Sequence, residues 1–226
     1  MCGRFVQQLT SDQIAEILGA TSEARMSGGR FNVAPTQPVL VLVEEGQRRV
    51  VTAHRWGLIP PWAKDPSIGP RLINARAETV AEKPAFRGSF RHHRCIIPAD
   101  AFYEWQKVGS TKAPYAIHRR DGKLMALAGL WAAWHDVDIG AEIMSCAIIT
   151  TEANATLAPI HDRMPVILPE DTWDTWLDPK VDDRGLLQSM LHPAPDALLE
   201  AYPISRRVND VRNNDPDLLI PLAATG

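Results

Sequence analysis

Residues 94–131 read RCIIPADAFYEWQKVGSTKAPYAIHRRDGKLMALAGLW, and this stretch shows the pattern of the whole chain. Short runs of apolar, β-branched and aromatic residues follow one another closely and are separated by Pro, Asp and Gly, which is typical of strands joined by tight turns. The strands are expected at 94–98, 102–106, 115–119 and 124–131. Asp121-Gly122 favours a two-residue hairpin turn between the last two of them.

The same pattern continues on both sides of this stretch. Strands are expected at 39–43 and 49–53, as a hairpin turning at 44–47, and at 143–150 and 164–168. Helices are expected after a capping box formed by Thr10 and Gln13, ending at Gly19, and at 170–177 and 184–191. Because strands dominate, we predict one α+β domain over residues 1–226, with a largely antiparallel, barrel-like β-sheet core and peripheral helices.

Composition places the chain among ordinary globular proteins. Of its 226 residues, 45% are hydrophobic and 23% are charged, and no apolar run approaches membrane-spanning length. Its three cysteines, Cys2, Cys95 and Cys146, make an odd number without C-x-x-C spacing, which argues against a disulfide framework. Cys95 and Cys146 have apolar neighbours, and we expect them at buried strand positions. A cytoplasmic protein without a membrane partner is expected.

Charge is distributed unevenly along the chain, although the net charge is only −3. Between 71 and 94 the cations are Arg71, Arg76, Lys83, Arg87, Arg91 and Arg94, against Glu78 and Glu82. The segment 170–183 carries six acidic residues and one lysine. A local basic face on an acidic protein can bind phosphates, whereas the alternative is a solvated surface of mixed charge.

Cys2 directly follows Met1, and this position has chemical consequences. Removal of Met1 would leave a thiol and an α-amine on adjacent carbons. The amine of such a 1,2-aminothiol condenses with an aldehyde to an imine, and the thiol then closes a thiazolidine ring. In short peptides the pKa is ~7.7 for an α-amine and ~8.5 for a thiol, so both nucleophiles are available near neutral pH. The alternative is that Cys2 is a small buried residue.

Glu104 lies in the strand predicted at 102–106. Alternation along a strand places Phe102 and Glu104 on one face, and Tyr103 and Trp105 on the other. Desolvation beside Phe102 would raise the pKa of Glu104 and make this carboxyl a usable acid and base. The alternative is an edge-strand glutamate in solvent.

Three further segments combine polar and apolar residues in a way that could serve chemistry. They are LINARAE at 72–78, IHDRMP at 160–165 and WGLIPPW at 56–62. The segment 72–78 would bring the amide of Asn74 and the guanidinium of Arg76 to the end of a strand. The segment 160–165 would place three polar groups just before a buried strand, and the segment 56–62 could form a base-stacking surface. Taken singly, Asn74 could be a turn former, His161 a structural histidine and the tryptophans core residues.

Six motifs in order give the chain a resemblance to a known family. They are MCGRF at 1–5, NVAP at 32–35, WGLIP at 56–60, NARAE at 74–78, CIIPAD followed by FYEW at 95–105, and IHDRMP at 160–165. In this combination the chain resembles the SOS response-associated peptidase (SRAP) family over nearly its whole length. The resemblance implies a compact α+β domain that recognises abasic sites in single-stranded DNA and crosslinks to them as a thiazolidine. It also implies self-processing that exposes the cysteine.

The resemblance also implies roles for individual residues. Cys2 would be the nucleophile, Asn74 would hold the sugar or the α-amine, Glu104 would transfer protons, and His161 would assist ring opening and crosslink reversal. Arg4, Arg76 and Arg163 would contact phosphates, and Asn32, Pro35 and Trp62 would shape the DNA channel. Ala63 follows Trp62 where some members have a second tryptophan. No metal or cofactor is expected, and the protein is expected to be a DNA-associated monomer.

Two other classes of protein compete with this interpretation. An N-terminal-nucleophile cysteine hydrolase would use the α-amine of Cys2 as base and an amide as substrate. A non-catalytic single-strand binding module would need neither Glu104 nor a free Cys2. A zinc site from His92, His93 and Cys95 is a weak alternative, because the three lack a fourth ligand at the usual spacing.

Overall fold

The computed structural model describes residues 2–46, 48–136 and 140–223. The strands are β1 (Phe5–Gln7), β2 (Thr21–Ser22), β3 (Arg30–Val33), β4 (Pro38–Glu45), β5 (Arg48–Trp56), β6 (Asn74–Arg76), β7 (Arg94–Ala99), β8 (Ala101–Val108), β9 (Thr111–Arg119), β10 (Met125–His135), β11 (Glu142–Glu152), β12 (Arg163–Pro165) and β13 (Leu199–Pro203). The α-helices are α1 (Ser11–Ile17), α2 (Arg87–His92), α3 (Trp173–Leu177) and α4 (Arg184–Ser189). The 3₁₀ turns are η1 (Pro66–Arg71), η2 (Glu170–Thr172), η3 (Asp196–Leu198), η4 (Arg206–Asn209) and η5 (Pro216–Leu219).

Five of these strands close into a barrel. Antiparallel pairing gives the order β11-β10-β7-β4-β5, and a parallel pairing of β5 with β11 joins the two ends. In that closing pair Arg55 lies opposite Ser145, and Trp56 lies opposite Cys146. Closure leaves these strands without an open edge. The prediction of an α+β domain with a barrel-like, largely antiparallel core and peripheral helices is therefore confirmed.

Both faces of the barrel strands are buried, which explains their long apolar runs. One face packs under the helices, against Ile14 of α1, Phe90 of α2, Trp176 of α3 and Leu187 of α4. The opposite face carries alternate residues of the same strands, including the buried Cys95 and Cys146, and packs with Phe5 of β1 and Phe102 of β8. Both of these cysteines lie in strands and are fully buried, as predicted.

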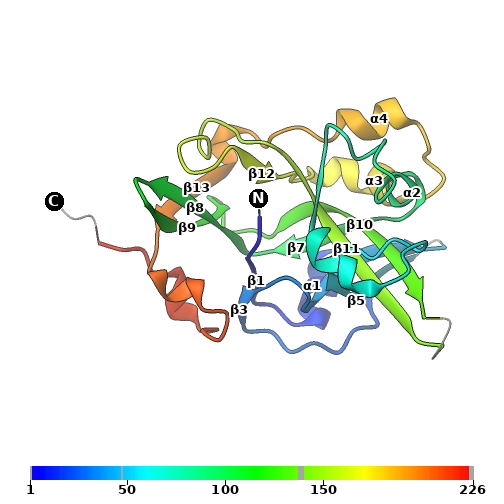
Figure 1. The fold of residues 1–226 in the computed structure, drawn as a ribbon, viewed down its shortest axis with the longest axis horizontal. Helices are drawn as coiled ribbons and strands as arrows, with labels where there is room; N and C mark the ends of the chain where they lie inside the picture. The colour runs from blue at the N-terminus through cyan, green and yellow to red at the C-terminus, as the bar shows by residue number, and fades with distance from the viewer. Residues whose placement is uncertain (1, 47, 137–139, 224–226) are drawn as a thin grey trace.

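A second sheet, in the order β13-β9-β8-β1-β3, lies beside the barrel. Figure 1 shows β8, β9 and β13 on the left, the barrel strands β5, β7, β10 and β11 on the right, and β1 between them. The outer face of this sheet packs with the C-terminal segment, where Val6 and Tyr103 meet Val208 of η4 and Leu218 of η5. Strand β1 pairs with β3 and β8 in the second sheet, and its Phe5 packs against the barrel strands. The residues just before β1 therefore lie where the barrel and the second sheet meet.

Several local predictions are confirmed. Thr10 and Gln13 form a reciprocal capping box at the start of α1. Strands β4 and β5 form the predicted hairpin, although Gln47 in its turn lies outside the described residues. The helix predicted at 170–177 consists of η2 followed by α3. Among the described residues, no helix is long and apolar enough to cross a membrane.

The hairpin predicted at Asp121-Gly122 is wrong. The chain does turn there, and Gly122 adopts a φ of 69°. However, β9 pairs with β8 and β13, whereas β10 pairs with β7 and β11, so the turn passes the chain from one sheet to the other. A turn dipeptide fixes only the local reversal, while burial of the flanking strands selects their partners. The strand predicted at 164–168 is also shorter, because β12 ends at Pro165 and only an isolated bridge at Ile167 follows.

Arg94 is part of the predicted basic face, but the structure shows that it is buried. Its side chain is only 2% exposed and donates five hydrogen bonds to backbone carbonyls. The acceptors are the carbonyls of Phe90, Arg91, Trp176, Asp178 and Val181. Burial lowers the pKa of Arg94 to about 10, which still leaves it charged at neutral pH. Arg94 therefore joins α2 and α3 to the barrel and contributes no charge to the surface.

Replacing Arg94 with methionine is expected to lower the free energy of unfolding by roughly 3 kcal/mol or more. The apolar stem is retained, but the change leaves several buried carbonyls without donors, and each unsatisfied group costs about 1–3 kcal/mol. Chemical denaturation measures the effect. The control Arg91→Met alters an exposed arginine of α2, three residues before Arg94, and should change stability by less than about 1 kcal/mol. Equal stability of the two variants would contradict the role of Arg94 in joining α2 and α3 to the barrel.

Candidate active site

Cys2 lies immediately before β1, where the barrel and the second sheet meet. It is fully buried in the same cluster as Phe5 and Phe102, and its thiol donates to the carbonyl of Arg4 at 3.8 Å. Burial raises the pKa of the Cys2 thiol far above its usual value, and the negative charge of Glu104 raises it further. The thiol is therefore held in its neutral form and needs a neighbouring base to react as a nucleophile.

Asn74 holds the backbone of Cys2. Strand β6 runs parallel to β11, with Asn74 opposite Ile148, and the side-chain amide nitrogen of Asn74 donates to the Cys2 carbonyl at 2.8 Å. Because the amide nitrogen must face that acceptor, the orientation of the Asn74 amide is fixed. Its oxygen is buried and has no hydrogen-bond partner among the described residues. This oxygen is a ready acceptor for an amine or a hydroxyl beside Cys2.

Glu104 lies on β8 with its side chain turned toward Cys2. The predicted alternation is confirmed, because Phe102 packs in the cluster of Cys2, whereas Tyr103 and Trp105 pack in the cluster on the other side of the sheet. Glu104 is 2% exposed, so the alternative of a solvated glutamate is wrong. Burial raises the pKa of Glu104, and nearby positive charge partly offsets this shift. A carboxyl with a raised pKa exchanges protons closer to neutral pH.

His161 approaches Glu104 from the loop before β12. Its Nε2 lies 3.9 Å from Oε2 of Glu104, and a quarter of its side chain is exposed. Its Nδ1 accepts a hydrogen bond from the backbone N–H of Arg163 at 2.9 Å, while Oδ1 of Asp162 lies 3.0 Å from the same nitrogen. The backbone donor is fixed, whereas the Asp162 side chain is 88% exposed. We therefore place the proton of neutral His161 on Nε2, facing Glu104.

Gln106 is a residue of this site that the sequence did not reveal. Its side-chain amide donates to the carbonyl of Pro159 at 2.9 Å, two residues before His161, and its oxygen accepts from the Tyr115 hydroxyl at 3.2 Å. Gln106 therefore connects the strand that carries Glu104 to the loop that carries His161. A glutamine near the end of a strand has no sequence signal for this role.

Arg4 and Asn32 bind the C-terminal segment. Nη1 of Arg4 donates to Oδ1 of Asn32 at 3.0 Å and to the carbonyl of Val208 at 2.9 Å. The buried amide nitrogen of Asn32 donates to three carbonyls of that segment, the nearest that of Asn213 at 2.9 Å. Asn32 can thus affect an outer surface only through the segment that it holds.

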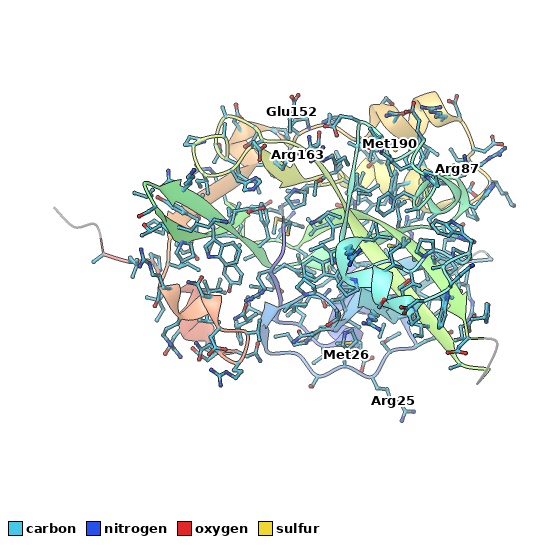
Figure 2. All side chains as sticks on the ribbon, viewed as in Figure 1. Arg25, Met26, Arg87, Glu152, Arg163 and Met190 are labelled. Atoms are coloured by element: carbon cyan, nitrogen blue, oxygen red, sulfur yellow. The ribbon has the colours of Figure 1, made fainter. Side chains whose placement is uncertain are left out.

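The other predicted DNA-contacting residues differ in exposure. Arg76 is exposed at the end of β6, and Trp62 is 60% exposed in the loop after β5. Pro35 is half-buried. Arg163 lies at the edge of the molecule beside Glu152, as Figure 2 shows, and its guanidinium forms a two-pronged ion pair with Glu78.

The structure brings Cys2, Asn74, Glu104 and His161 together, with Arg163 two residues beyond His161.

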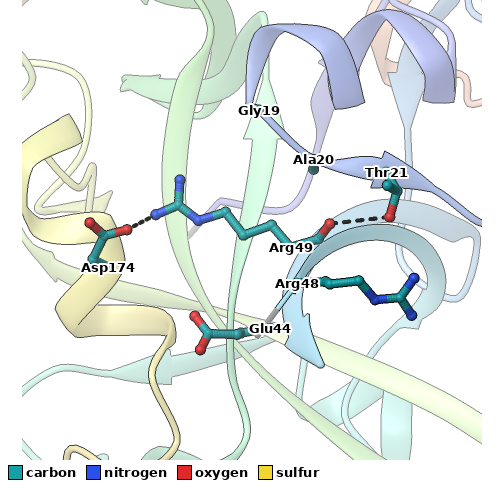
Figure 3. Close-up of a pocket in the computed structure, with 7 residues that line it drawn as sticks. All are labelled: Gly19, Ala20, Thr21, Glu44, Arg48, Arg49 and Asp174. Atoms are coloured by element: carbon teal, nitrogen blue, oxygen red, sulfur yellow. Dashed lines mark hydrogen bonds and ion pairs between the residues drawn. The ribbon is translucent and has the colours of Figure 1, made fainter. Parts of the chain in front are cut away.

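A separate hollow lies at the far end of the β4–β5 hairpin. Figure 3 shows its lining, in which Arg49 reaches across to Asp174 of α3, and Thr21 donates to the carbonyl of Arg49. The hollow contains none of the predicted site residues and no histidine or cysteine. We therefore assign the chemistry to the region around Cys2.

The zinc alternative receives no support from the geometry. Cys95 is fully buried in the barrel, whereas His92 and His93 are exposed at the end of α2. Within residues 2–46, 48–136 and 140–223, no three His, Cys, Asp or Glu side chains converge as a metal site would require.

The geometry defines a buried cysteine site near the chain start, with an amide, a carboxyl and an imidazole around the thiol. The family model for the SOS response associated peptidase (SRAP) matches residues 1–211, and the chain belongs to this family. The resemblance inferred from the six motifs is thereby confirmed.

Similar proteins span bacteria and vertebrates. The abasic site processing protein YoqW of Bacillus subtilis is 44% identical over 224 residues, covering 97% of this chain and 99% of the relative. YedK of Escherichia coli is 31% identical over 228 residues, covering 98% and 100%, and HMCES of Xenopus tropicalis is 31% identical over 272 residues, covering 100% and 79%. A crystal structure of a Bacteroides thetaiotaomicron protein, 27% identical, superposes with a TM-score of 0.90 over 98% of this chain and 100% of that chain.

Proposed function

We propose that this protein processes abasic sites in DNA by forming a covalent thiazolidine crosslink through Cys2. The relatives named above are abasic site processing proteins, which supports abasic-site DNA as the substrate. The observation that carries the chemistry is the arrangement at Cys2, where Asn74 holds its carbonyl and the charge of Glu104 acts on its thiol. Such a crosslink would shield the lesion during the response to DNA damage.

The reaction begins with the ring-opened deoxyribose aldehyde. After removal of Met1, which lies outside the described residues, the Cys2 amine adds to the aldehyde carbon and water leaves, giving an imine. The thiol sulfur then adds to the imine carbon, and the thiol proton passes to the nitrogen. One water is lost overall and no oxidant or metal is consumed. Ring closure is intramolecular, so effective molarities of about 10⁵ M or more are available.

The neighbouring side chains fit the proton transfers of this reaction. Sugar opening requires a proton on the ring oxygen and removal of one from the anomeric hydroxyl, and imine formation requires protonation of the departing hydroxyl. Glu104, with its raised pKa, serves as the acid and base, and His161 presents Nε2–H toward it. The unpaired oxygen of Asn74 accepts from the Cys2 amine or from a sugar hydroxyl.

We infer a single-stranded DNA partner, contacted by exposed cations such as Arg76, and a monomeric, DNA-associated protein of the cytoplasm. Removal of Met1 by the protein itself, as a thiol peptidase reaction with Glu104 as base, would expose the amine. A lyase step at the bound sugar is a further activity that the amine permits.

The direct test is to mix the protein with a single-stranded oligonucleotide that carries one abasic site. A denaturant-resistant shift on a gel, absent with the undamaged strand, is expected. Stoichiometric adduct supports crosslinking. Repeated turnover of peptides or amides without an adduct would instead support a cysteine hydrolase, and binding without an adduct would support a non-catalytic module.

Arg76→Ala is expected to weaken binding to any single strand without preventing the crosslink. Each lost phosphate contact releases fewer counterions, so the slope of log K against log salt should become shallower by about 0.7. Fluorescence anisotropy at several salt concentrations measures the change. At saturating protein the crosslink yield should remain as in the wild type. An unchanged affinity and slope would place the phosphate-binding face elsewhere, for example around Arg206 and Arg212.

His161→Ala is expected to slow crosslinking less than it slows crosslink reversal. Reversal requires protonation of a thiazolidine that is otherwise stable. The Nε2–H group of His161 faces Glu104, with Nε2 3.9 Å from Oε2 of Glu104. Release is followed by trapping the freed abasic strand with a small aminooxy reagent. Asp162→Asn serves as control, because Asp162 is exposed and contacts the other nitrogen of the same ring. A reversal rate like that of the wild type would remove His161 from this step.

A further inference from the structure

Arg163 has few donors left for a phosphate. Its Nη1 donates to Oε1 of Glu78 at 2.6 Å, and its Nη2 donates to Oε2 of Glu78 at 2.9 Å and to the carbonyl of Thr150 at 2.7 Å. Its Nε is buried, and the side chain as a whole is only 15% exposed. The fork of the guanidinium, which would hold a phosphate with two parallel bonds, is therefore occupied by a carboxylate.

Arg76 provides the contrast. Arg76 and Thr150 are register partners in the pairing of β6 with β11, and the Thr150 carbonyl also accepts a hydrogen bond from Arg163, so both arginines lie near the Thr150 end of β11. Arg76 is exposed, and no hydrogen bond or ion pair of its side chain occurs among the described residues. Of these two cations, one is open to solvent and the other is held by Glu78.

We propose that Glu78 is a specificity-determining residue, which occupies Arg163 in place of a DNA phosphate and must be displaced before a strand can use that arginine. The proposal rests on the proposed function, because it takes a DNA strand as the ligand. A carboxylate and a phosphodiester each offer two oxygens at a spacing that suits the guanidinium fork, so they cannot both bind Arg163 in this way. Glu78 is 52% exposed, which leaves it room to turn toward solvent.

The consequence is selectivity for the lesion. Competition from Glu78 lowers the non-covalent affinity for every strand, damaged or not. At an abasic site the covalent bond retains the strand, so weak initial binding costs little there. On undamaged DNA no bond forms, and the same weakening shortens the time for which the protein is bound.

The test compares Glu78→Gln with Glu82→Gln. Glu82 pairs with Arg184 at 2.8 Å, is similarly exposed and lies four residues along the chain, so both variants lose one negative charge from the same segment. The probe is an undamaged oligothymidylate, and the measurements are its dissociation constant and the salt dependence. Glu78→Gln should bind about 2–5-fold more tightly than Glu82→Gln, the range expected for release of an exposed ion pair. Its salt slope should steepen by about 0.7, as for one added phosphate contact.

A double-mutant cycle shows whether Glu78 acts through Arg163. In an Arg163→Ala background, Glu78→Gln should differ no more from its parent than Glu82→Gln does. Weaker binding by Glu78→Gln, equal binding by the two single variants, or a gain that survives loss of Arg163 would each overturn the proposal. If the wild type binds oligothymidylate and never crosslinks to an abasic strand, the proposed function fails while this proposal is still decided by the cycle. If no variant binds the strand, both fail.

Discussion

Cys2→Ser is expected to abolish the denaturant-resistant adduct with abasic DNA. Serine keeps the α-amine, so an imine can still form, but imines hydrolyse readily and a hydroxyl closes the five-membered ring far less favourably than a thiol. Because the serine hydroxyl is as close to the imine carbon as the thiol was, the loss comes from its weaker nucleophilicity, and the stable product should fall below detection. The measurement is a denaturing gel after overnight incubation.

The chain supplies a matched control for this change. Cys146→Ala removes another fully buried cysteine, one in β11 of the barrel, and should leave the adduct yield unchanged in the folded fraction. A second form of the test blocks the amine. Protein that retains Met1, or whose α-amine is acetylated, keeps the thiol of Cys2 and should still form no stable adduct. A stable adduct from amine-blocked protein would contradict the aminothiol mechanism.

Glu104→Gln is expected to slow crosslinking by about 10²–10⁴-fold, the usual loss when a positioned acid or base is removed. Binding to the strand should change little, because Glu104 is buried and faces Cys2 rather than solvent. The measurement is a time course at saturating protein, with undamaged DNA as the control for affinity. A crosslinking rate like that of the wild type would make Glu104 a structural residue.

The raised pKa of Glu104 also predicts that the stability of the folded protein depends on pH. Burial disfavours the carboxylate in the folded protein, so the folded state holds this proton to higher pH than the unfolded chain, whose glutamate titrates near ~4.3. The contribution of Glu104 to stability is therefore fully present below ~4.3 and is lost as pH rises through the folded-state pKa. Glu104→Gln, whose side chain cannot ionise, should be at least as stable as the wild type at pH 7 although it crosslinks slowly. Denaturation at pH 4 and 7 checks this difference.

Local patterns predicted those parts of the fold and site that depend on near neighbours. Alternation at 102–105 placed Glu104 beside Phe102, and the capping box at Thr10 placed α1, because each follows from backbone geometry within a few residues. The parallel pairing of β5 with β11, which closes the barrel, joins residues about 90 positions apart and has no local signature. The hairpin predicted at Asp121-Gly122 is wrong for the same reason, because the pairing partners of β9 and β10 are not set by the turn between them.

Charge counting failed where tertiary contacts decide the role of a side chain. Arg94 belongs by sequence to the basic segment 71–94, yet its side chain is buried against backbone carbonyls. Similarly, Asn32 binds the C-terminal segment through contacts more than 170 residues away in sequence. Such roles depend on which distant groups meet, and a single sequence does not specify that.

The most direct test of the central claim is the intact mass and thiol count of the adduct. Protein lacking Met1 is mixed with an abasic oligonucleotide, denatured and treated with iodoacetamide. We expect a mass equal to protein plus oligonucleotide minus one water, with two of the three cysteines alkylated, since ring closure consumes the Cys2 thiol while Cys95 and Cys146 become accessible. An adduct with all three thiols alkylated, or one mapped to a lysine, would contradict the thiazolidine at Cys2.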